Sequence, residues 1–312
     1  MADSHVAGPG DRLPTVLVTT FFVTALVLAV ELAGWYLSGS LAILGDGIHV
    51  FSDLISIGVS LVTIWIAMRA TKPQFTFGFH RTEVFAALAN GCLLLAMALL
   101  IGYDAIHRLD GSHVVSSVPM LITAFIGLLG NLYSAYLLQH DENLNIRSAF
   151  VHVAGDALSS MGVIIGGVVI LFTGLYAVDA IISLIIAAII VFSAYSIIRS
   201  SLSILLESAP YDIDAKALRN AVLGVNGVRG VHDIHVWRTC SDMVFAMMHV
   251  EINDTKLSSA HMISEAIDEH LWRTFGISHT TIQVEPYGSA CENRDARHVL
   301  GHKNRRTLPR DA

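Results

Sequence analysis

The sequence predicts an α-helical membrane protein in which a bundle of six transmembrane helices precedes a small α+β domain. Charged residues make up only 14% of the 312 residues and hydrophobic residues 54%, whereas about 25% charged residues is usual in soluble domains. Six apolar stretches reach the roughly 20 residues that a helix needs to cross a bilayer. From Pro210 onward the pattern changes to short alternating segments, which are typical of a soluble domain.

The six apolar stretches are expected to be membrane-spanning helices joined by short polar loops. They cover residues 14–36, 42–68, 83–107, 114–138, 148–174 and 177–199. The first stretch does not fit a signal peptide, because its apolar run is too long and no small-residue cleavage site precedes a soluble domain. Residues 1–12 are polar and predicted to be disordered, and the transmembrane domain is expected to cover 13–207.

Basic residues near the helix ends orient the bundle. The flanks on the side of the chain termini carry most of them, namely Arg12, Arg69, Lys72, Arg81, Arg147 and Arg199. The loops on the other side hold only Arg108. Positive charge favours the cytoplasmic side of a membrane, so both termini are expected in the cytoplasm.

The C-terminal region is expected to form an α+β domain over residues 208–287, followed by a flexible tail at 288–312. Its elements are predicted in the order helix, strand, strand, helix, strand, at 211–223, 229–238, 243–251, 257–275 and 279–285. This order fits a small sheet with helices on one face. Period-two alternation predicts His232, Ile234 and Val236 on one face of the first strand and Asp233, His235 and Trp237 on the other.

Charge and cysteine content exclude some classes of protein. The net charge is −7 and no long basic run is present, so nucleic acid is not an expected partner. The three cysteines, Cys92, Cys240 and Cys291, form no CxxC pair and no disulfide framework. A reducing cytoplasm therefore suits the soluble domain.

Two matched pairs of ionisable residues lie within the predicted spans. His49 and Asp53 are four residues apart in GDGIHVFSD, and His152 and Asp156 repeat this spacing in FVHVAGD. Residues four apart share one helix face, and ionisable groups at membrane depth are costly and rare. One such residue is equally well explained by a hydrogen bond between helices. Two pairs, however, supply two nitrogens and two oxygens, enough for a tetrahedral zinc ion with no position left for water.

Other polar residues in the spans have less specific interpretations. Asp46 lies one turn before His49 on the same face, where it fits either a supporting or entrance group or a solvated helix end. Glu31, Asn90, Asp104 and Asn131 are interpreted as packing or pathway polarity.

Four segments resemble the cation diffusion facilitator family, in its zinc-transporting branch. They are SGSLAILGDGIHVFSDLISIGVSL, TFGFHRTEVFAALANG, NLNIRSAFVHVAGDALSSMGVII and VHDIHVW, and the resemblance covers roughly residues 15–287. It implies a homodimer in which each chain has a six-helix bundle and a ferredoxin-like cytoplasmic domain. It also implies exchange of a cytoplasmic divalent metal for protons by alternating access, with His49, Asp53, His152 and Asp156 as the transport site.

The ligand chemistry agrees with that implication. Two imidazoles with two carboxylates favour Zn²⁺, with Cd²⁺ or Co²⁺ also suitable, because all-oxygen sites suit Mg²⁺, Mn²⁺ or Ca²⁺. Metal binding needs neutral histidine and ionised aspartate, so protons compete for the same groups. Either His49 or His152 is inferred to carry the proton on the return step.

The resemblance implies further metal contacts and a hinge. Residues matching His232, His249, His261 and Glu285 contribute to cytoplasmic metal sites near the dimer interface, which are expected to be regulatory. Gln283 stands where histidine is usual, and His279 and Cys291 are nearby substitutes. His80 is a further candidate ligand in the loop after the second span. Arg81 and Glu207 match an ion pair that joins the bundle to the cytoplasmic domain.

Two other functions are alternatives to proton-coupled zinc efflux. An intramembrane zinc metalloenzyme would need HExxH or a similar motif with an open ligand position, and HExxH does not occur in the sequence. A membrane-bound metal sensor could use the soluble domain, yet it would not need ligands in the middle of the membrane. The short loop QHDENLNIR lacks a histidine-rich run, which favours a bacterial inner membrane.

Overall fold

The structure, a computed structural model, describes residues 9–67, 77–110, 113–138, 144–240 and 243–288. The chain divides into two compact units, residues 1–201 and 202–312. Each unit has its own cluster of buried apolar residues.

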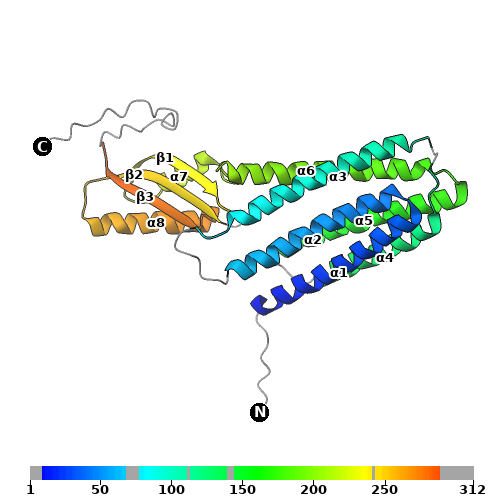
Figure 1. The fold of residues 1–312 in the computed structure, drawn as a ribbon. Helices are drawn as coiled ribbons and strands as arrows, with labels where there is room; N and C mark the ends of the chain where they lie inside the picture. Colours follow the sequence, from blue (N-terminus) through cyan, green and yellow to red (C-terminus); the bar gives the residue numbers. More distant parts are fainter. Residues whose placement is uncertain (1–8, 68–76, 111–112, 139–143, 241–242, 289–312) are drawn as a thin grey trace, which may run out of the picture. The chain divides into compact units, whose positions relative to one another are not determined.

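The first unit consists of long helices (Figure 1). They are α1 (Pro9–Ser38), α2 (Leu41–Ala67), α3 (Arg81–His107), α4 (Ser117–Leu138), α5 (Leu144–Thr173) and α6 (Ala177–Leu205). Each contains a segment long and apolar enough to cross a membrane, which confirms the six predicted spans. Helix α1 begins at Pro9, inside the stretch 1–12 for which the sequence predicts disorder.

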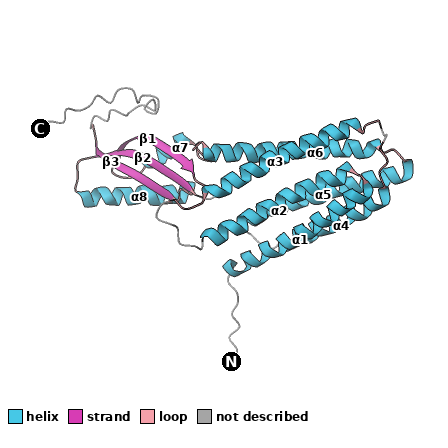
Figure 2. Ribbon diagram, in the orientation of Figure 1, coloured by secondary structure: helices cyan, strands magenta, loops and turns pink. Residues whose placement is uncertain are grey.

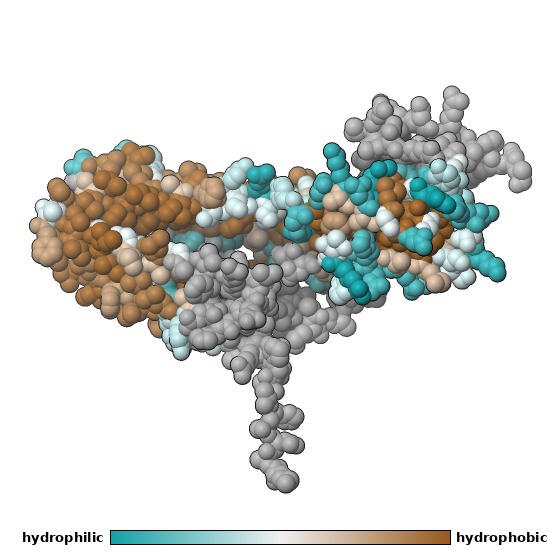
Figure 3. All heavy atoms as spheres, turned by 180° about the vertical axis from the view of Figure 1, so that it is seen from behind, coloured by the Kyte–Doolittle hydropathy of each residue, from teal (hydrophilic) through white to brown (hydrophobic). Residues whose placement is uncertain are grey.

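Helices α1, α2, α4 and α5 pack closely side by side. Contacts link α1 to α2 and α4, and α4 to α5. A glycine allows the closest approach of α1 to α4, since a Cβ atom on Gly34 would lie only 2.0 Å from Thr123 Oγ1. Small residues commonly permit such contacts between membrane helices. Large apolar side chains such as Phe22 and Phe172 face outward and give this unit the apolar surface seen in Figure 3, as a lipid environment requires.

The second unit is a three-stranded sheet with two helices on one face (Figure 2). Its elements are α7 (Ala215–Leu223), β1 (Val228–Arg238), β2 (Val244–Ile252), α8 (Leu257–Phe275) and β3 (His279–Pro286). Strands β1 and β2 pair antiparallel, and β3 pairs parallel to β2. This confirms the predicted αββαβ order. Helix α7 begins four residues later than predicted, because Asp214 caps it by accepting hydrogen bonds from the backbone N–H groups of Lys216 and Ala217.

A β-bulge in β1 corrects the predicted faces of that strand. His232 pairs with His249, but His235 pairs with Met247, so β1 carries one extra residue between them. Asp233 occupies this position with a φ of 51°. The bulge reverses the alternation: Ile234 continues the helix-covered face, where Val231 is already buried. His232 therefore lies with His235 on the uncovered face, rather than with Ile234 as period two predicts.

Candidate metal centre

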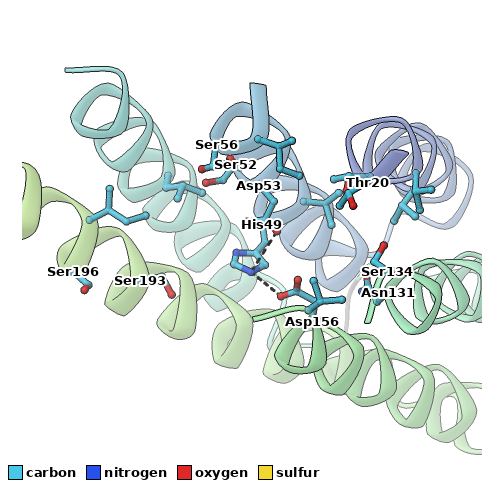
Figure 4. A pocket seen from close by; sticks show the side chains of 18 of the residues that line it. Thr20, His49, Ser52, Asp53, Ser56, Asn131, Ser134, Asp156, Ser193 and Ser196 are labelled. Carbon is cyan, nitrogen blue, oxygen red and sulfur yellow. Dashed lines mark hydrogen bonds and ion pairs between the residues drawn. The ribbon is translucent and has the colours of Figure 1, made fainter. Parts of the chain in front are cut away.

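Helices α2 and α5 bring three of the four predicted transport ligands together. His49 Nε2 lies 3.0 Å from Asp156 Oδ1 and 3.9 Å from Asp53 Oδ2. The three side chains point toward one another in Figure 4, and one ligand atom from each lies within 4.8 Å of the others. His152 lies on α5, one turn before Asp156, but its side chain is outside the described residues.

These separations suit a small dication. Ligand atoms about 2.0–2.2 Å from a tetrahedral zinc ion lie about 3.3–3.6 Å apart. The two distances from His49 Nε2, 3.0 and 3.9 Å, bracket that range. With a neutral imidazole, the two carboxylates also match the two positive charges of the metal.

The three ligands line a cavity of about 720 Å³. Its polar lining includes Thr20, Ser52, Ser56, Asn131, Ser134, Ser193 and Ser196, several of which are seen around the site in Figure 4. On α2 the lining runs from His49 to Ile57, toward the C-terminal end of that helix. On α1 it runs from Thr20 to Val27, across the middle of the helix. The cavity thus extends from the three side chains toward the end of the bundle where α2 ends.

The opposite side of the metal site is sealed. Apolar residues of five helices pack there with little or no exposed surface, including Ile43, Ala98, Met120, Val163 and Ile190. Asp46 and Glu31 are buried as well, at 3% and 2% exposure. Asp46 accepts hydrogen bonds of 3.2 Å from Ser159 Oγ and Ser160 Oγ on α5, so it supports the α2–α5 contact and is not a solvated helix end.

Hydrogen bonds from other helices position α2. Near the metal site, Asn90 Nδ2 on α3 donates to Ser52 Oγ at 2.8 Å. At the start of α2, the buried Asp179 of α6 accepts hydrogen bonds from Ser40 Oγ at 2.5 Å, Leu41 N at 2.9 Å and Ala42 N at 3.4 Å. Asp179 therefore caps the N-terminus of a helix other than its own.

Sequence reasoning missed the role of Asp179. Ser40 directly precedes an apolar helix, which is a recognised N-cap signal. Asp179 itself, an acid in the first turn of the last predicted span, was a second signal. Only the fold shows that these residues, 139 positions apart, meet.

A second ligand cluster lies on the uncovered face of the sheet in the C-terminal unit. His232, His249 and Glu285 each offer a ligand atom within 4.8 Å of the others. His249 Nδ1 lies 2.7 Å from Glu285 Oε1, to which Gln283 Nε2 also donates at 2.8 Å. His232 Nε2 and Glu285 Oε2 are buried, make no hydrogen bond and lie 3.5 Å apart. Two such atoms at the spacing of two zinc ligands fit a bound metal ion.

The remaining candidates lie apart from these clusters. His261 is exposed on α8, where it pairs with Glu265 at 3.4 Å. Within a single chain it is therefore not part of the cluster that contains His232. His279 packs edge-on against Phe245, with ring centroids 5.6 Å apart. His80 immediately precedes α3, and no candidate metal cluster of the described residues includes it. Cys291 is outside the described residues.

Comparison with known families decides the assignment. A family described as "Cation efflux transmembrane domain" matches residues 17–206, and "Cation efflux protein, cytoplasmic domain" matches residues 210–287. The chain belongs to the cation efflux family. This confirms the resemblance inferred from the sequence and places the chain in a transporter family rather than an enzyme family, which disfavours both alternative functions.

Three relatives show the range of cation efflux proteins that resemble this chain. "Zinc transporter ZitB" of Yersinia pestis is 34% identical over 273 residues, which cover 86% of each protein. "Cadmium, cobalt and zinc/H(+)-K(+) antiporter" of Bacillus subtilis is 33% identical over 290 residues, covering 91% of this chain and 92% of that protein. "Metal cation efflux system protein CzcD" of Cupriavidus metallidurans is 34% identical over 276 residues, covering 88% and 86%. With its six apolar helices, this cation efflux protein is a multi-pass membrane protein of bacterial type.

Proposed function

We propose that this protein exports zinc from the cytoplasm in exchange for protons by alternating access. The convergence of His49, Asp53 and Asp156 at one end of a cavity lined in part by serine, threonine and asparagine carries the proposal. The cavity extends toward the end of the bundle where the loop charges place the cytoplasm, and buried apolar residues pack on the far side. This arrangement fits the inward-facing conformation of a carrier before its metal binds. The carrier is proposed to lie in a bacterial inner membrane with both termini in the cytoplasm.

His152 is proposed as the fourth transport ligand, because its spacing to Asp156 repeats that of His49 to Asp53. The ligand set explains coupling to protons, which compete with the metal for imidazole and carboxylate. The names of the relatives extend the proposal to Cd²⁺ and Co²⁺. Binding of two protons on the ligands during the return step would neutralise the two carboxylates after the metal leaves.

Transport in proteoliposomes tests the proposed function. Under an imposed pH gradient, we expect Zn²⁺, Cd²⁺ and Co²⁺ to be transported at least about tenfold faster than Mn²⁺, because imidazole ligands disfavour harder ions. The counterflow of protons should follow zinc, as read by a fluorescent pH indicator. Zinc bound by the protein without any zinc-dependent proton flux would instead support a sensor.

The cluster on the cytoplasmic domain is proposed to be a regulatory metal site in a homodimer. His232, His249 and Glu285 would hold Zn²⁺ on the uncovered face of the sheet, and a second copy would supply His261. A metal at such an interface draws two domains together, and it regulates transport if it binds one conformation more tightly.

Replacement of His249 by alanine tests this site. We expect the zinc bound per chain to fall, because the variant removes a ligand and leaves Glu285 Oε1 without its 2.7 Å contact. Isothermal titration of the full-length protein measures the change. His270→Ala, at an exposed position on α8, is the matched control. Equal zinc stoichiometry in both variants would contradict the regulatory site.

The ion pair between Arg81 and Glu207 stays a prediction, because the two residues belong to separate units. A feature of Glu207 supports it. The hydrogen bonds from Glu207 N to Ile204 O and from Ser208 N to Ser203 O end α6 in a Schellman motif. Glu207 occupies the left-handed position, with a φ of 56°, where glycine is usual. A glutamate in a backbone conformation that glycine adopts more easily suggests a functional role.

Glu207→Gly should therefore separate stability from function. We expect a gain of about 1 kcal/mol in unfolding free energy, since glycine tolerates the left-handed conformation, together with slower zinc transport because the acid is lost. Thermal unfolding and proteoliposome flux give the two values. Glu207→Gln keeps the strain and removes the charge, so it should slow transport without the gain. Full transport by both variants would argue against the hinge ion pair.

A further inference from the structure

A buried acid on α1 is not used by the metal site. The carboxyl group of Glu31 lies between α2 and α4, next to a glycine on each of these helices. A Cβ atom on Gly47 would lie 3.6 Å from Glu31 Oε2, and one on Gly127 would lie 3.0 Å from Glu31 Oε1. Ser160 Oγ would be 3.8 Å from that same Gly127 atom. The two glycines thus leave the space that this carboxyl group fills, beside the serine that donates to Asp46.

The surroundings of Glu31 oppose a negative charge. The residue is 2% exposed, and its buried Oε2 makes no hydrogen bond. Asp46, by contrast, accepts hydrogen bonds from two serines. Among the described residues, the carboxylates of Asp46 and Asp53 on α2 and of Asp156 on α5 act on Glu31, while α4 faces it with Gly127. An unpaired buried carboxylate costs several kcal/mol, and neighbouring carboxylates add to that cost. These surroundings favour the protonated, neutral carboxyl group in this conformation.

The position of Glu31 connects that proton to the transport cycle. Asp46 precedes His49 by three residues on α2, and Ser159 and Ser160 follow Asp156 on α5 by three and four. This places the layer of Glu31 and Asp46 about one turn beyond the metal site, on the sealed side away from the cavity. Water reaches Glu31 only when that side opens. Once it is open, hydration stabilises the carboxylate, and the side cannot close again until the charge is neutralised.

We infer that Glu31 is a proton-binding group whose protonation from the outer side closes the outer half of the bundle. The inference rests on the proposed zinc/proton exchange and adds to it a proton site separate from the metal ligands. One proton adds to one carboxylate when the outer half closes. A dication arriving at His49, Asp53 and Asp156 then opposes that proton electrostatically and favours its release, and the proton leaves to the outer side when that half opens to deliver the metal. The metal site and Glu31 are thus occupied in alternation, the first by the metal ion and the second by a proton.

Two measurements on the full-length protein test this inference. Zinc is titrated into detergent-solubilised protein in weak buffer, and the protons released per zinc bound are counted. Zinc flux into proteoliposomes is then measured against the pH of the receiving side. Glu31→Gln imitates the protonated acid and should still bind zinc, release about one proton fewer per zinc, and lose about tenfold or more in flux, within the usual range of coupling between sites. Its flux should depend less on receiving-side pH than that of the wild type, with the remaining dependence coming from the transport ligands.

Control variants separate a proton site from a structural role. Asp104→Asn makes the same acid-to-amide change in a partly exposed pair with Arg108 and should keep the wild-type proton count. Glu31→Asp retains an acid and should restore part of the pH dependence. If Glu31→Gln does not fold, Gly127→Ala is used, because its Cβ displaces the carboxyl group; it should lower the proton count and the pH dependence of flux. Proton release equal to wild type in the folded variant would overturn the inference, whatever the flux. Absence of zinc flux in the wild type would contradict the proposed function instead.

Discussion

Replacing Asp156 by alanine is expected to abolish zinc transport while the protein stays folded. The variant removes one ligand and the 3.0 Å partner of His49 Nε2, and it leaves the site one negative charge short of the dication. Loss of residues that merely support metal ligands costs about 10- to 100-fold in affinity, so we expect zinc affinity at this site to fall by at least about 100-fold. Proteoliposome flux and zinc titration measure the effect.

Ser193→Ala is the control for Asp156→Ala. Ser193 lines the same cavity but offers no carboxylate or imidazole, so its loss should leave zinc affinity within about threefold of wild type. Size-exclusion chromatography and thermal unfolding establish that both variants are folded. Unchanged zinc flux in Asp156→Ala would count against the transport site and with it the proposed exporter.

Asp179→Ala is expected to destabilise the bundle more than any other N-cap replacement that the described helices offer. The side chain is 1% exposed and accepts hydrogen bonds from one hydroxyl and two backbone N–H groups of another helix. Burying a donor without a partner costs about 1–3 kcal/mol, so the loss should reach about 3 kcal/mol. Thermal unfolding in detergent measures it, and zinc transport should fall with it because α2 carries His49 and Asp53.

Asp214→Ala provides the comparison with an ordinary cap. Asp214 accepts two backbone hydrogen bonds at the start of α7, but it is exposed. Water replaces the lost acceptor there, so the cost should be about 1 kcal/mol. Asp179→Asn, which keeps one acceptor oxygen, should lie between the two. Equal unfolding midpoints for Asp179→Ala and Asp214→Ala would show that the interhelical cap does not stabilise the bundle.

Much of the fold follows from local patterns in the sequence. The six apolar stretches have lengths that only membrane helices need, and the αββαβ order follows from a change of period after Pro210. The meeting of His49, Asp53 and Asp156 was predictable because a matched spacing on two helices is itself an unusual pattern. These features depend on residues close together in the chain, where periodicity carries the information.

The features that the sequence did not reveal depend on single backbone angles or on distant contacts. The bulge at Asp233, where φ is 51°, places His232 on the other face of β1 from Ile234. A period-two pattern of residues cannot predict where such a positive φ occurs. The start of α7 depended on whether Asp214 would act as a cap. The partners of Asp179 and the surroundings of Glu31 come from helices far apart in sequence, so only their packing assigns a role to these two acids.

The cap at the start of α2 has a consequence for how the carrier moves. With Ser40, Leu41 and Ala42 held by Asp179, that end of the helix acts as a fulcrum. Asp53 follows Leu41 by 12 residues, about 18 Å along the axis at 1.5 Å per residue. A tilt of about 10° around the fulcrum would swing Asp53 through about 3 Å, which exceeds the length of a zinc–oxygen bond. A small tilt of α2 would therefore be enough to move Asp53 out of bonding distance and release an ion bound at the proposed site.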